Sequence, residues 1–495
     1  MHNFPAVDAN GKKYNRTMFV IILLVGTFCT VLNQTILSTA FPTLMHAFNV
    51  NTSTVQWLTT GFMMVNGILI PVSAWLSGRF NTKWLYLSAM IIFEIGTVTA
   101  WVAPTFSVLF IARLVQAVGV GIAMPLLQTI MLSIFPPEKR GFALGLAGIV
   151  VGLAPAIGPT LSGWVIDVSS WRALFGIIAP IVAVVIVLGL FFVKPVLPTN
   201  KSKLDYFSLV LSTIGFGSLL YGFSSVGNDG WGSPVVIWSL IIGVIFIILF
   251  GWRQLVMKHP FLNLDVFKAR EFRLGTLISS VVFMAMVGVE MVLPLYLQIV
   301  RGMSAFHSGL TLLPGAILTG LMSPVTGQLF DRFGARRLAM GGLFLLTVGT
   351  FPFIFLTKDT PTIYVTILYA TRMFGVSMSM MPVTTSGMNA LPIKRMGDGT
   401  AANNTVRQVS GSIATAVMIS ILSNVTSNHM PAKHLLKINP LAYQSGAINA
   451  TLKGYMAAFG IAFVISAIAF LSTFLLKKGK YMVPADKNDD EGGND

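Results

Sequence analysis

The stretch PVSAWLSGRFNTKWL, from Pro71 to Leu85, occurs a second time as PVTGQLFDRFGARRL, from Pro324 to Leu338. The copies start 253 residues apart and are identical at six positions, among them Arg79 and its counterpart Arg332. Each copy ends one apolar run and begins the next, so each is a basic turn between two helices. A basic turn repeated half a chain apart is typical of a duplicated helical transporter.

Composition indicates a membrane protein. Hydrophobic residues make up 54% of the 495 positions and charged residues only 10%, with a mean hydropathy of +0.78. A soluble domain carries about 25% charged residues. The net charge of +16 lies in short turns between apolar runs and forms no continuous patch, so we expect no nucleic-acid partner. These basic residues are better interpreted as topology signals.

Fourteen apolar runs are long enough to cross a bilayer, which takes about 20 residues. We expect spans near 17–44, 56–78, 84–103, 105–134, 141–166, 173–193, 206–226, 234–252, 274–299, 308–330, 338–357, 361–391, 408–425 and 454–476. The repeat makes spans 1–6 the counterparts of spans 9–14, with spans 7 and 8 inserted between them. The sequence therefore predicts an all-α integral membrane protein, built as two six-helix bundles plus two inserted helices.

The predicted spans define the domains and the topology. We expect a cytoplasmic N-terminal segment, a first bundle, a linker with two inserted helices, a second bundle and a disordered cytoplasmic tail, over 1–16, 17–193, 194–273, 274–476 and 477–495. Cytoplasmic termini place 25 of the 33 Lys and Arg residues inside, including Arg407 just before the thirteenth span. Because basic residues concentrate on the cytoplasmic side, we expect this orientation in the cytoplasmic membrane.

Four segments carry recognisable motifs. The second basic turn reads G-x-L-x-D-R-x-G-x-R-R from Gly327 to Arg337, and span 4 contains ARLVQAVGVG, similar to R-x-x-Q-G-x-G-x-G. Span 5 contains GLAPAIGPTLSGW, close to G-x-x-x-G-P-x-x-G-G, and span 1 contains LNQTILSTAFP, similar to L-D-x-T-I-x-x-x-A-x-P. Together, and over essentially the whole chain, these motifs resemble the major facilitator superfamily. Within it the chain resembles the fourteen-span drug:proton antiporters of the EmrB/QacA type, with the lincomycin-export branch closest.

The resemblance implies a gate at the basic turns. We expect Asp331 near the N-terminus of span 11, where a carboxylate meets the positive end of a helix. Opening and closing of the cytoplasmic side would break and remake such pairs, whereas the alternative is a plain topology-setting turn. The first copy has Gly78 in place of Asp331, so the gate is predicted to be asymmetric. The expected gating residues are Arg79, Lys83, Gly327, Asp331, Arg332, Gly334, Arg336 and Arg337.

Span 5 is rich in small residues. Gly141/Gly145 and Gly148/Gly152 are G-x-x-x-G pairs, which let helices approach closely in lipid. We expect this helix at the interface between the halves, with kinks at its prolines, although simple packing is the alternative role. The resemblance implies that it is the antiporter motif, comprising Gly152, Pro155, Gly158, Pro159 and Gly163.

Charged residues inside spans indicate function, because burying charge in a bilayer is costly. Glu94, Arg113, Glu290 and Arg372 are the clear cases. The resemblance links Arg113 to proton coupling, through adjustment of the proton affinity of a nearby carboxylate.

The acid expected in span 1 is replaced by Asn33, which cannot bind a proton reversibly. Glu290 lies on span 9, the counterpart of span 1, and is therefore the expected principal site of protonation or cation recognition. Glu94 is a second candidate for coupling, with a protonated structural carboxyl as the alternative.

The expected substrate cavity combines polar groups with methionine, which is soft and adaptable. Lipid-facing packing for methionine and a helix-end position for Arg372 are the alternatives. The predicted cavity residues are Asn33, Gln34, Gln116, Arg372 and Met381.

The sequence contains no G-x-x-x-x-G-K-[ST] phosphate loop and no cluster of metal ligands. We therefore expect neither an enzyme nor a bound cofactor, with a proton gradient as the energy source. The predicted function is efflux of amphiphilic or hydrophobic small molecules by a monomer, through alternating access. A lipid or metabolite exporter on the same fold is the leading alternative. A non-transporting receptor or structural protein is a different class, which the intramembrane Glu290 and Arg113 argue against.

Overall fold

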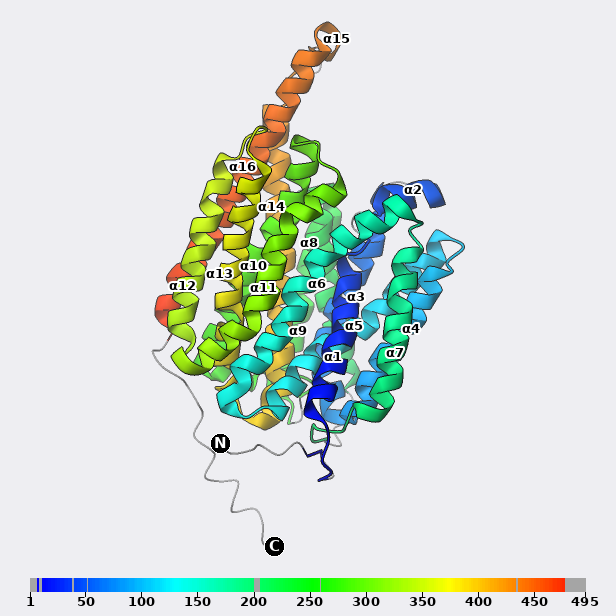
Figure 1. Ribbon diagram of the computed structural model, residues 1–495, viewed down its shortest axis with the longest axis vertical. Helices are drawn as coiled ribbons and strands as arrows, with labels where there is room; N and C mark the ends of the chain where they lie inside the picture. Colours follow the sequence, from blue (N-terminus) through cyan, green and yellow to red (C-terminus); the bar gives the residue numbers. More distant parts are fainter. Residues whose placement is uncertain are drawn as a thin grey trace.

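The computed structural model describes residues 7–8, 11–37, 40–50, 52–199, 205–258, 260–432 and 435–476. These residues form a bundle of long helices that run between two ends (Figure 1). They contain no strand, only an isolated bridge between Val7 and Lys13. The predicted tail, 477–495, and parts of the predicted N-terminal segment lie outside the described residues.

The first half contains six long helices and one short helix. They are α1 (Arg16–Thr35), α2 (Phe41–Phe48), α3 (Thr52–Arg79), α4 (Thr82–Trp101), α5 (Phe106–Ile134), α6 (Arg140–Val168) and α7 (Ala173–Phe192), with the 3-10 turn η1 (Pro137–Lys139) before α6. Apolar spans become helices because a helix satisfies its own backbone hydrogen bonds in lipid. Side chains cap some of the starts, as where Asn15 Oδ1 accepts the Met18 N–H at 3.1 Å.

The second half repeats this order with six long helices. They are α10 (Arg270–Leu295), α11 (Ala305–Phe333), α12 (Ala335–Thr350), α13 (Thr362–Met388), α14 (Met396–His429) and α16 (Pro440–Ser472). Short elements join or extend them, namely the π-helix η3 (Tyr296–Val300), η4 (Phe351–Phe355), η5 (Ile393–Arg395), α15 (Leu435–Ile438) and η6 (Thr473–Leu475). The two halves are separated by α8 (Tyr206–Asp229), α9 (Pro234–Val256) and η2 (Leu264–Lys268).

Thirteen of the described helices are long and apolar enough to cross a membrane. A further long helix, α13, has 27 residues, is richer in Thr and Ser, and packs among α10, α11 and α12. The fourteen predicted spans therefore each have a helix, and the predicted two bundles with an inserted pair are confirmed.

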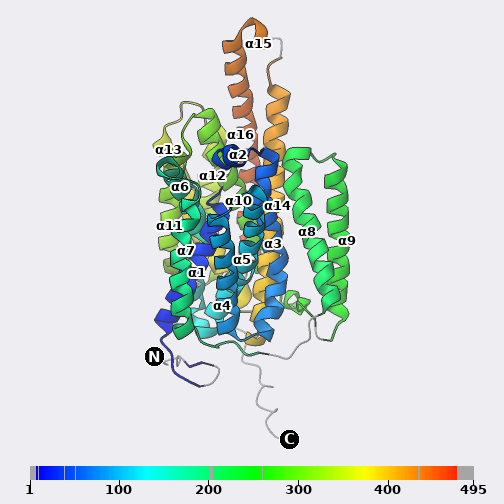
Figure 2. The ribbon, with the colours of Figure 1, turned by 90° about the vertical axis from the view of Figure 1, so that its right-hand side faces the viewer.

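Three predicted span boundaries are wrong. The predicted first span extends to 44, but α1 ends at Thr35 and Pro42 lies in the first turn of α2, where a missing N–H costs nothing. The thirteenth and fourteenth helices begin at Met396 and Pro440, well before the predicted 408 and 454. The predicted connection 426–453 is therefore largely helical, and α14 and α16 extend beyond the other helices toward α15 (Figures 1 and 2).

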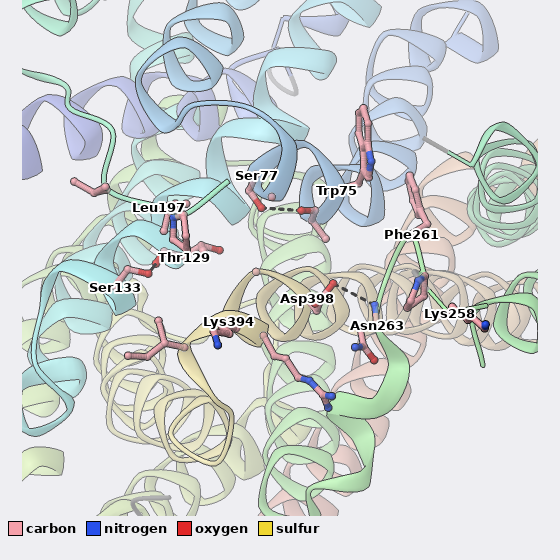
Figure 3. Close-up of a pocket in the computed structure, with 18 residues that line it drawn as sticks. Trp75, Ser77, Thr129, Ser133, Leu197, Lys258, Phe261, Asn263, Lys394 and Asp398 are labelled. Carbon is pink, nitrogen blue, oxygen red and sulfur yellow. Dashed lines mark hydrogen bonds between the residues drawn. The ribbon is translucent and has the colours of Figure 1, made fainter. Parts of the chain in front are cut away.

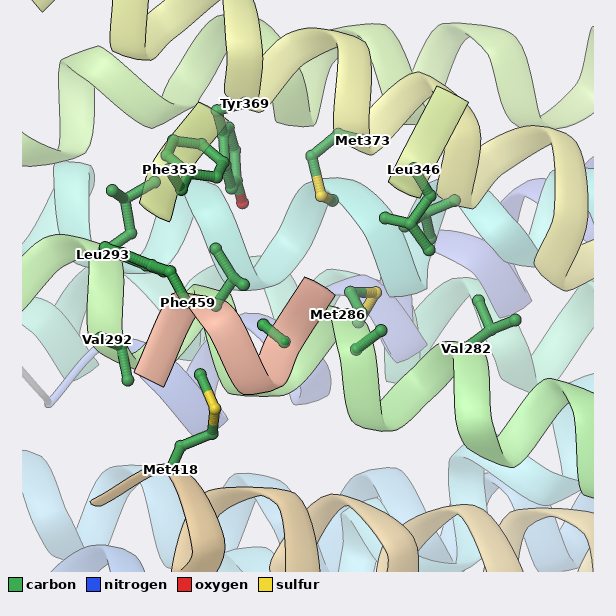
Figure 4. Close-up of a cluster of buried hydrophobic side chains, with 14 of the residues drawn as sticks. Val282, Met286, Val292, Leu293, Leu346, Phe353, Tyr369, Met373, Met418 and Phe459 are labelled. Atoms are coloured by element: carbon green, nitrogen blue, oxygen red, sulfur yellow. The ribbon is translucent and has the colours of Figure 1, made fainter. Parts of the chain in front are cut away.

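Each half has an apolar core of its own. In the second half, buried side chains of α10, α12, α13 and α16 form one cluster that includes Met286, Tyr369 and Phe459 (Figure 4). In the first half, Phe93 and Phe175 belong to a separate cluster. Because tightly packed cores deform little, each half is suited to move as a body.

The inserted helices α8 and α9 form a hairpin on one side of the bundle (Figure 2). Helix α8 packs against both α3 of the first half and α14 of the second. The hydroxyls of Thr60 and Ser224 lie 3.1 Å apart, and Trp231 Nε1 donates to Ser420 Oγ at 2.8 Å. The hairpin therefore covers the line along which α3 and α14 meet.

An ion pair joins the two legs of this hairpin at its open end. Arg253 Nε and Nη2 donate to the two carboxylate oxygens of Asp205 at 2.6 and 2.9 Å. These hydrogen bonds hold the pKa of Asp205 at about 2, below its ordinary value. Next along the chain, Gln254 donates to Ser208 Oγ at 2.7 Å and accepts the Leu262 N–H at 3.0 Å, which fixes the linker that follows.

We expect Asp205→Asn to lower the free energy of unfolding by about 1 kcal/mol at pH 7, because a charge-assisted contact is lost. Since the folded-state pKa is depressed, this stabilisation is present above the ordinary Asp pKa of about 4. It is lost as the pH falls toward about 2. The apparent melting temperature in detergent at pH 7 and pH 3 measures it, and the deficit of the variant should shrink at pH 3.

Lys268→Gln is the control, because Lys268 is 77% exposed and its pair with Asp265 contributes little. A deficit for Asp205→Asn that is equal at the two pH values contradicts the assignment.

Candidate functional site

The two halves meet most extensively along α6 and α11. A Cβ atom added to Gly327 would meet the carbonyl of Gly141, and one added to Gly145 would meet the carbonyl of Ser323. The backbones of the two helices therefore touch without intervening side chains. The close approach predicted from the G-x-x-x-G pairs is confirmed, and α11 is the partner.

The predicted antiporter-motif residues face two different helices. Gly152 and Gly163 face α11, whereas Gly158 faces Thr35 of α1. Pro155 and Pro159 both lie inside α6. The motif thus packs α6 against its own half and against the other half at once.

Asp331 joins the halves at the end of the bundle where α11 finishes and α6 begins. We call this the basic end, because it carries the basic turns with Arg79, Lys139 and Arg332. The Asp331 carboxylate accepts the N–H groups of Gly141 and Phe142, at 3.0 and 3.1 Å. Asp331 lies four residues before the start of α12, as predicted, and its carboxylate also binds the N-terminus of α6 in the other half, which was not predicted.

The other predicted gating residues lie around this contact. Gly334 ends α11 with a φ of +79°, a conformation that favours glycine, and Lys83 Nζ donates to the Leu190 carbonyl at 2.6 Å. The side chains of Arg79, Arg332 and Arg337 are exposed and that of Arg336 is partly buried. Of these side chains, that of Asp331 contacts the other half through the N–H groups of Gly141 and Phe142.

Further polar contacts near the basic end were not predicted. Their partners are separated by 135 to 276 residues, so no local pattern indicates them. They are Arg140 Nη1 to Asn389 Oδ1 at 3.4 Å, Asn404 Nδ2 to Gln128 Oε1 at 2.7 Å, and the Asn263 N–H to Asp398 Oδ1 at 3.1 Å.

A cavity of about 390 Å³ lies between the halves at this end. Its wall includes Ser77 and Thr129 from the first half, Asp398 from the second, and Asn263 from the linker after the inserted hairpin. Figure 3 shows the Asn263 N–H directed at Asp398. The linker therefore forms part of the boundary between the halves.

Arg113 is fully buried on α5 and binds the asparagine that replaces the family acid. Its Nη1 donates to Asn33 Oδ1, to the Asn33 carbonyl at 3.1 Å and to Gln116 Oε1 at 2.9 Å. The Gln116 amide in turn donates to Thr97 Oγ1 at 3.0 Å, and Phe62 presents its ring face 4.2 Å from the guanidinium. The predicted Asn33, Gln116 and Arg113 thus form one buried network.

The structure separates other predicted residues from this network. Glu94 on α4 is partly buried, lies near Cys29, and forms no ion pair with Arg113 in the described residues. Gln34 is partly buried on α1. Met381 is buried against Gly148 of α6, so it packs between the halves rather than beside Asn33.

Glu290 and Arg372 lie near each other inside the second half, without an ion pair between them among the described residues. Glu290 is partly buried on α10 and lies close enough to Arg372 of α13 for the two charges to interact. The fully buried Arg372 donates from Nε to Thr350 Oγ1 at 3.1 Å and from Nη2 to the Ala285 carbonyl. One turn beyond Glu290, Pro294 precedes the π-helix η3, a type of irregularity found frequently at functional sites.

A further arginine that is buried inside a span, Arg407, was missed. The predicted thirteenth span begins at 408 and leaves Arg407 in the cytoplasm, but α14 begins at Met396. Arg407 therefore lies about 16 Å inside the helix. Its side chain is 5% exposed and its guanidinium lies 4.7 Å from the centre of the Phe283 ring. The polar run around Asn403 and Gln408 lowers the local hydropathy, which hides the first turns of this helix from a search for apolar runs.

We expect Gly327→Ala to lower both stability and transport, because its Cβ meets backbone atoms of Gly141 and forces α6 and α11 apart. An overpacked contact of this kind costs about 1 to 3 kcal/mol. Thermal unfolding and dye efflux measure the two effects. Gly460→Ala on α16 is the matched control, since no atom lies within 4 Å of the added Cβ. Equal behaviour of the two variants contradicts the close-contact account.

We expect Asp331→Asn to weaken the joint at the basic end by about 1 kcal/mol, because the helix N-terminus loses a negative charge. This raises the population of the open basic end about fivefold. The labelling rate of a cysteine at Ser323, in a Cys29→Ala background, reports that opening. The control is Asp359→Asn, at an exposed residue, which should leave the labelling rate unchanged. An unchanged labelling rate in Asp331→Asn contradicts a gating role for this contact.

The sequence and the fold of this chain are similar to those of known proteins. Residues 23–415 match the family model of the Major Facilitator Superfamily. The chain is 48% identical to the uncharacterized MFS-type transporter YcnB of Bacillus subtilis, with 94% of this chain and 96% of that protein covered. It is 41% identical to the lincomycin resistance protein LmrB of the same organism, over 95% and 97% of the two chains.

More distant proteins agree. The multidrug export protein EmrB of Escherichia coli is 29% identical, over 88% of this chain and 86% of that protein. The solved structure of the human organic anion transporter MFSD10 shares the fold, with a TM-score of 0.63 at 13% identity over 92% of this chain and 99% of that one. The resemblance predicted from the four motifs is confirmed. The chain is a multi-pass membrane protein that belongs to the Major Facilitator Superfamily.

Proposed function

We propose that the protein is a proton-coupled multidrug efflux transporter, which exports amphiphilic or hydrophobic small molecules by alternating access. The relatives named as lincomycin resistance and multidrug export proteins support drug export. The observation that carries the coupling is the position of Glu290 beside Arg372, inside the second half. A carboxyl group there changes the charge of the membrane interior when it binds or releases a proton.

Glu290 is the proposed protonation site. When it is ionised, its charge attracts Arg372, and this attraction is lost when Glu290 is protonated. The hydrogen bonds of Arg372 to Thr350 and to the Ala285 carbonyl do not depend on that proton. The free energy of the second half therefore depends on the proton. Asn33 holds no such proton, and its bonds to Arg113 give the first half a fixed polar network. The two halves thus have different roles in coupling.

The proposed cycle opens the basic end by breaking the contact of Asp331 with Gly141 and Phe142. Both termini are proposed to face the cytoplasm, because the basic turns then meet the negative inner leaflet of the cytoplasmic membrane. The protein is proposed to act as a monomer. It needs no bound cofactor in this scheme, because the proton gradient supplies the energy.

Ethidium efflux from proteoliposomes, with and without an imposed proton gradient, tests the function. Efflux that is accelerated by the gradient supports an antiporter. Absence of gradient-dependent efflux of ethidium and of other amphiphilic dyes contradicts the proposal and favours a lipid or metabolite exporter or a non-transporting protein.

We expect Glu290→Gln to lower gradient-driven efflux about tenfold or more and to retain exchange of substrate without a gradient, because coupling is lost and binding is kept. Glu94→Gln, measured in the same efflux assay, shows how much the second carboxyl contributes to coupling. The control is Glu138→Gln, at an exposed residue in η1. Gradient dependence that is unchanged in Glu290→Gln excludes this residue as the coupling site.

A further inference from the structure

We infer that Arg407 is the recognition site for a negatively charged group, so that the preferred substrates are apolar molecules carrying a carboxylate or sulfonate. The inference deepens the proposed function and rests on it. It assigns a substrate class to a residue that the sequence motifs leave without a role.

Arg407 lies where a substrate crossing the membrane must pass. Its position about 16 Å inside α14 is near the middle of a hydrocarbon layer of about 30 Å. The neighbouring Asn404 reaches Gln128 of the first half, and Gln408 packs beside Gly67 of α3. The guanidinium itself contacts Phe283 of α10 and Met380 of α13 in the second half. Arg407 is therefore within one helical turn of the boundary between the halves.

The protein leaves this guanidinium without an oxygen acceptor. Among the described residues, its Nε and Nη1 have no hydrogen-bond partner, and Nη2 reaches only the sulfur of Met380 at 4.0 Å. Thioether sulfur is a weak acceptor. Arg113 and Arg372 also have nitrogen atoms without a partner among the described residues, but each donates to at least two oxygen atoms, whereas Arg407 donates to none. A buried charge without its hydrogen bonds is costly, and the planar fork of arginine matches a carboxylate or sulfonate well.

The charge balance of the membrane interior favours an anion over a cation. The charged side chains that are buried or partly buried in the middle of the described spans are Arg113, Arg372, Arg407, Glu94 and Glu290. Three positive charges exceed two negative ones even when both glutamates are ionised, and protonation increases the excess. Because charges interact more strongly in a low dielectric, an anionic ligand lowers the electrostatic energy in either state, and a cationic ligand raises it.

The surroundings suit an apolar body attached to that anion. The Phe283 ring faces Arg407, and Met380 offers a soft, adaptable surface. The contribution of the anion to binding can be separated from that of the apolar body with two ligands that share the body. They are 1-pyrenebutyrate, which carries a carboxylate, and its uncharged methyl ester. Energy transfer from tryptophan to pyrene measures their binding to the full-length protein in lipid nanodiscs.

Because the two ligands partition differently into lipid, each variant is compared with the unchanged protein for each ligand separately. We expect Arg407→Gln to weaken binding of the acid about tenfold or more, the loss of one charge-assisted contact, and to leave the ester within about twofold. Arg172→Gln is the matched control. Arg172 lies over Trp171 and donates to the Ala103 carbonyl, outside the middle of the spans, so neither affinity should change.

Equal weakening of acid and ester by Arg407→Gln overturns the inference, because it indicates a structural role, and so does an unchanged affinity for the acid. If the glutamine variant does not fold, Arg407→Lys provides the test. It keeps the charge and loses the fork, so it should weaken the acid selectively by several-fold, and no selective loss overturns the inference. Failure of gradient-driven efflux of ethidium and of anionic and neutral amphiphilic dyes in the unchanged protein contradicts the proposed function. Loss of acid selectivity at Arg407 with efflux intact overturns the substrate class alone.

Discussion

Contact between the backbones of α6 and α11 is the constraint on which the rest of the structure depends. With Gly141 against Gly327 and Gly145 against Ser323, the two helices approach until main-chain atoms touch. This approach brings the last turn of α11 to the first turn of α6, which places the Asp331 carboxylate on two unpaired N–H groups. A larger side chain at these positions separates the helices and moves the carboxylate away from its donors. The close packing of α6 on α11 and the contact of Asp331 with α6 therefore both depend on the same small residues.

The interior of the two halves is unequal although their helices correspond. In the first half Nη1 of Arg113 donates to neutral oxygen atoms of Asn33 and Gln116, so these hydrogen bonds do not depend on a proton. In the second half Arg372 lies near Glu290, whose charge is variable, and Arg407 has no oxygen acceptor in the described residues. The matching positions on α5 and α13 both hold an arginine, and the halves differ in what those arginines face, Asn33 on α1 and Glu290 on α10. Proton binding and anion recognition both fall to the second half in this scheme.

The inserted hairpin is connected to the boundary between the halves as well as to the lipid. The Arg253–Asp205 ion pair fixes its open end, and Gln254 holds Leu262, directly before the Asn263 whose N–H is bound by Asp398 on α14. Helix α8 also contacts both α3 and α14 along their length. These contacts connect the hairpin to both halves of the bundle.

The sequence by itself determined the class of fold, the number of long helices and their pairing into halves, because apolar length and a repeated basic turn are local patterns. It also identified Arg113, Glu290 and the small residues of α6, since charges and glycines in apolar runs are conspicuous. Only the tertiary structure decided that Asp331 binds the N-terminus of α6, that Glu94 forms no ion pair with Arg113 among the described residues, and that Arg407 is buried. The first two depend on residues far apart in the chain. The third depends on a helix whose polar side chains are stabilised by packing against other helices. Hydropathy measures the preference of a segment for lipid, and it does not report which polar groups the neighbouring helices satisfy.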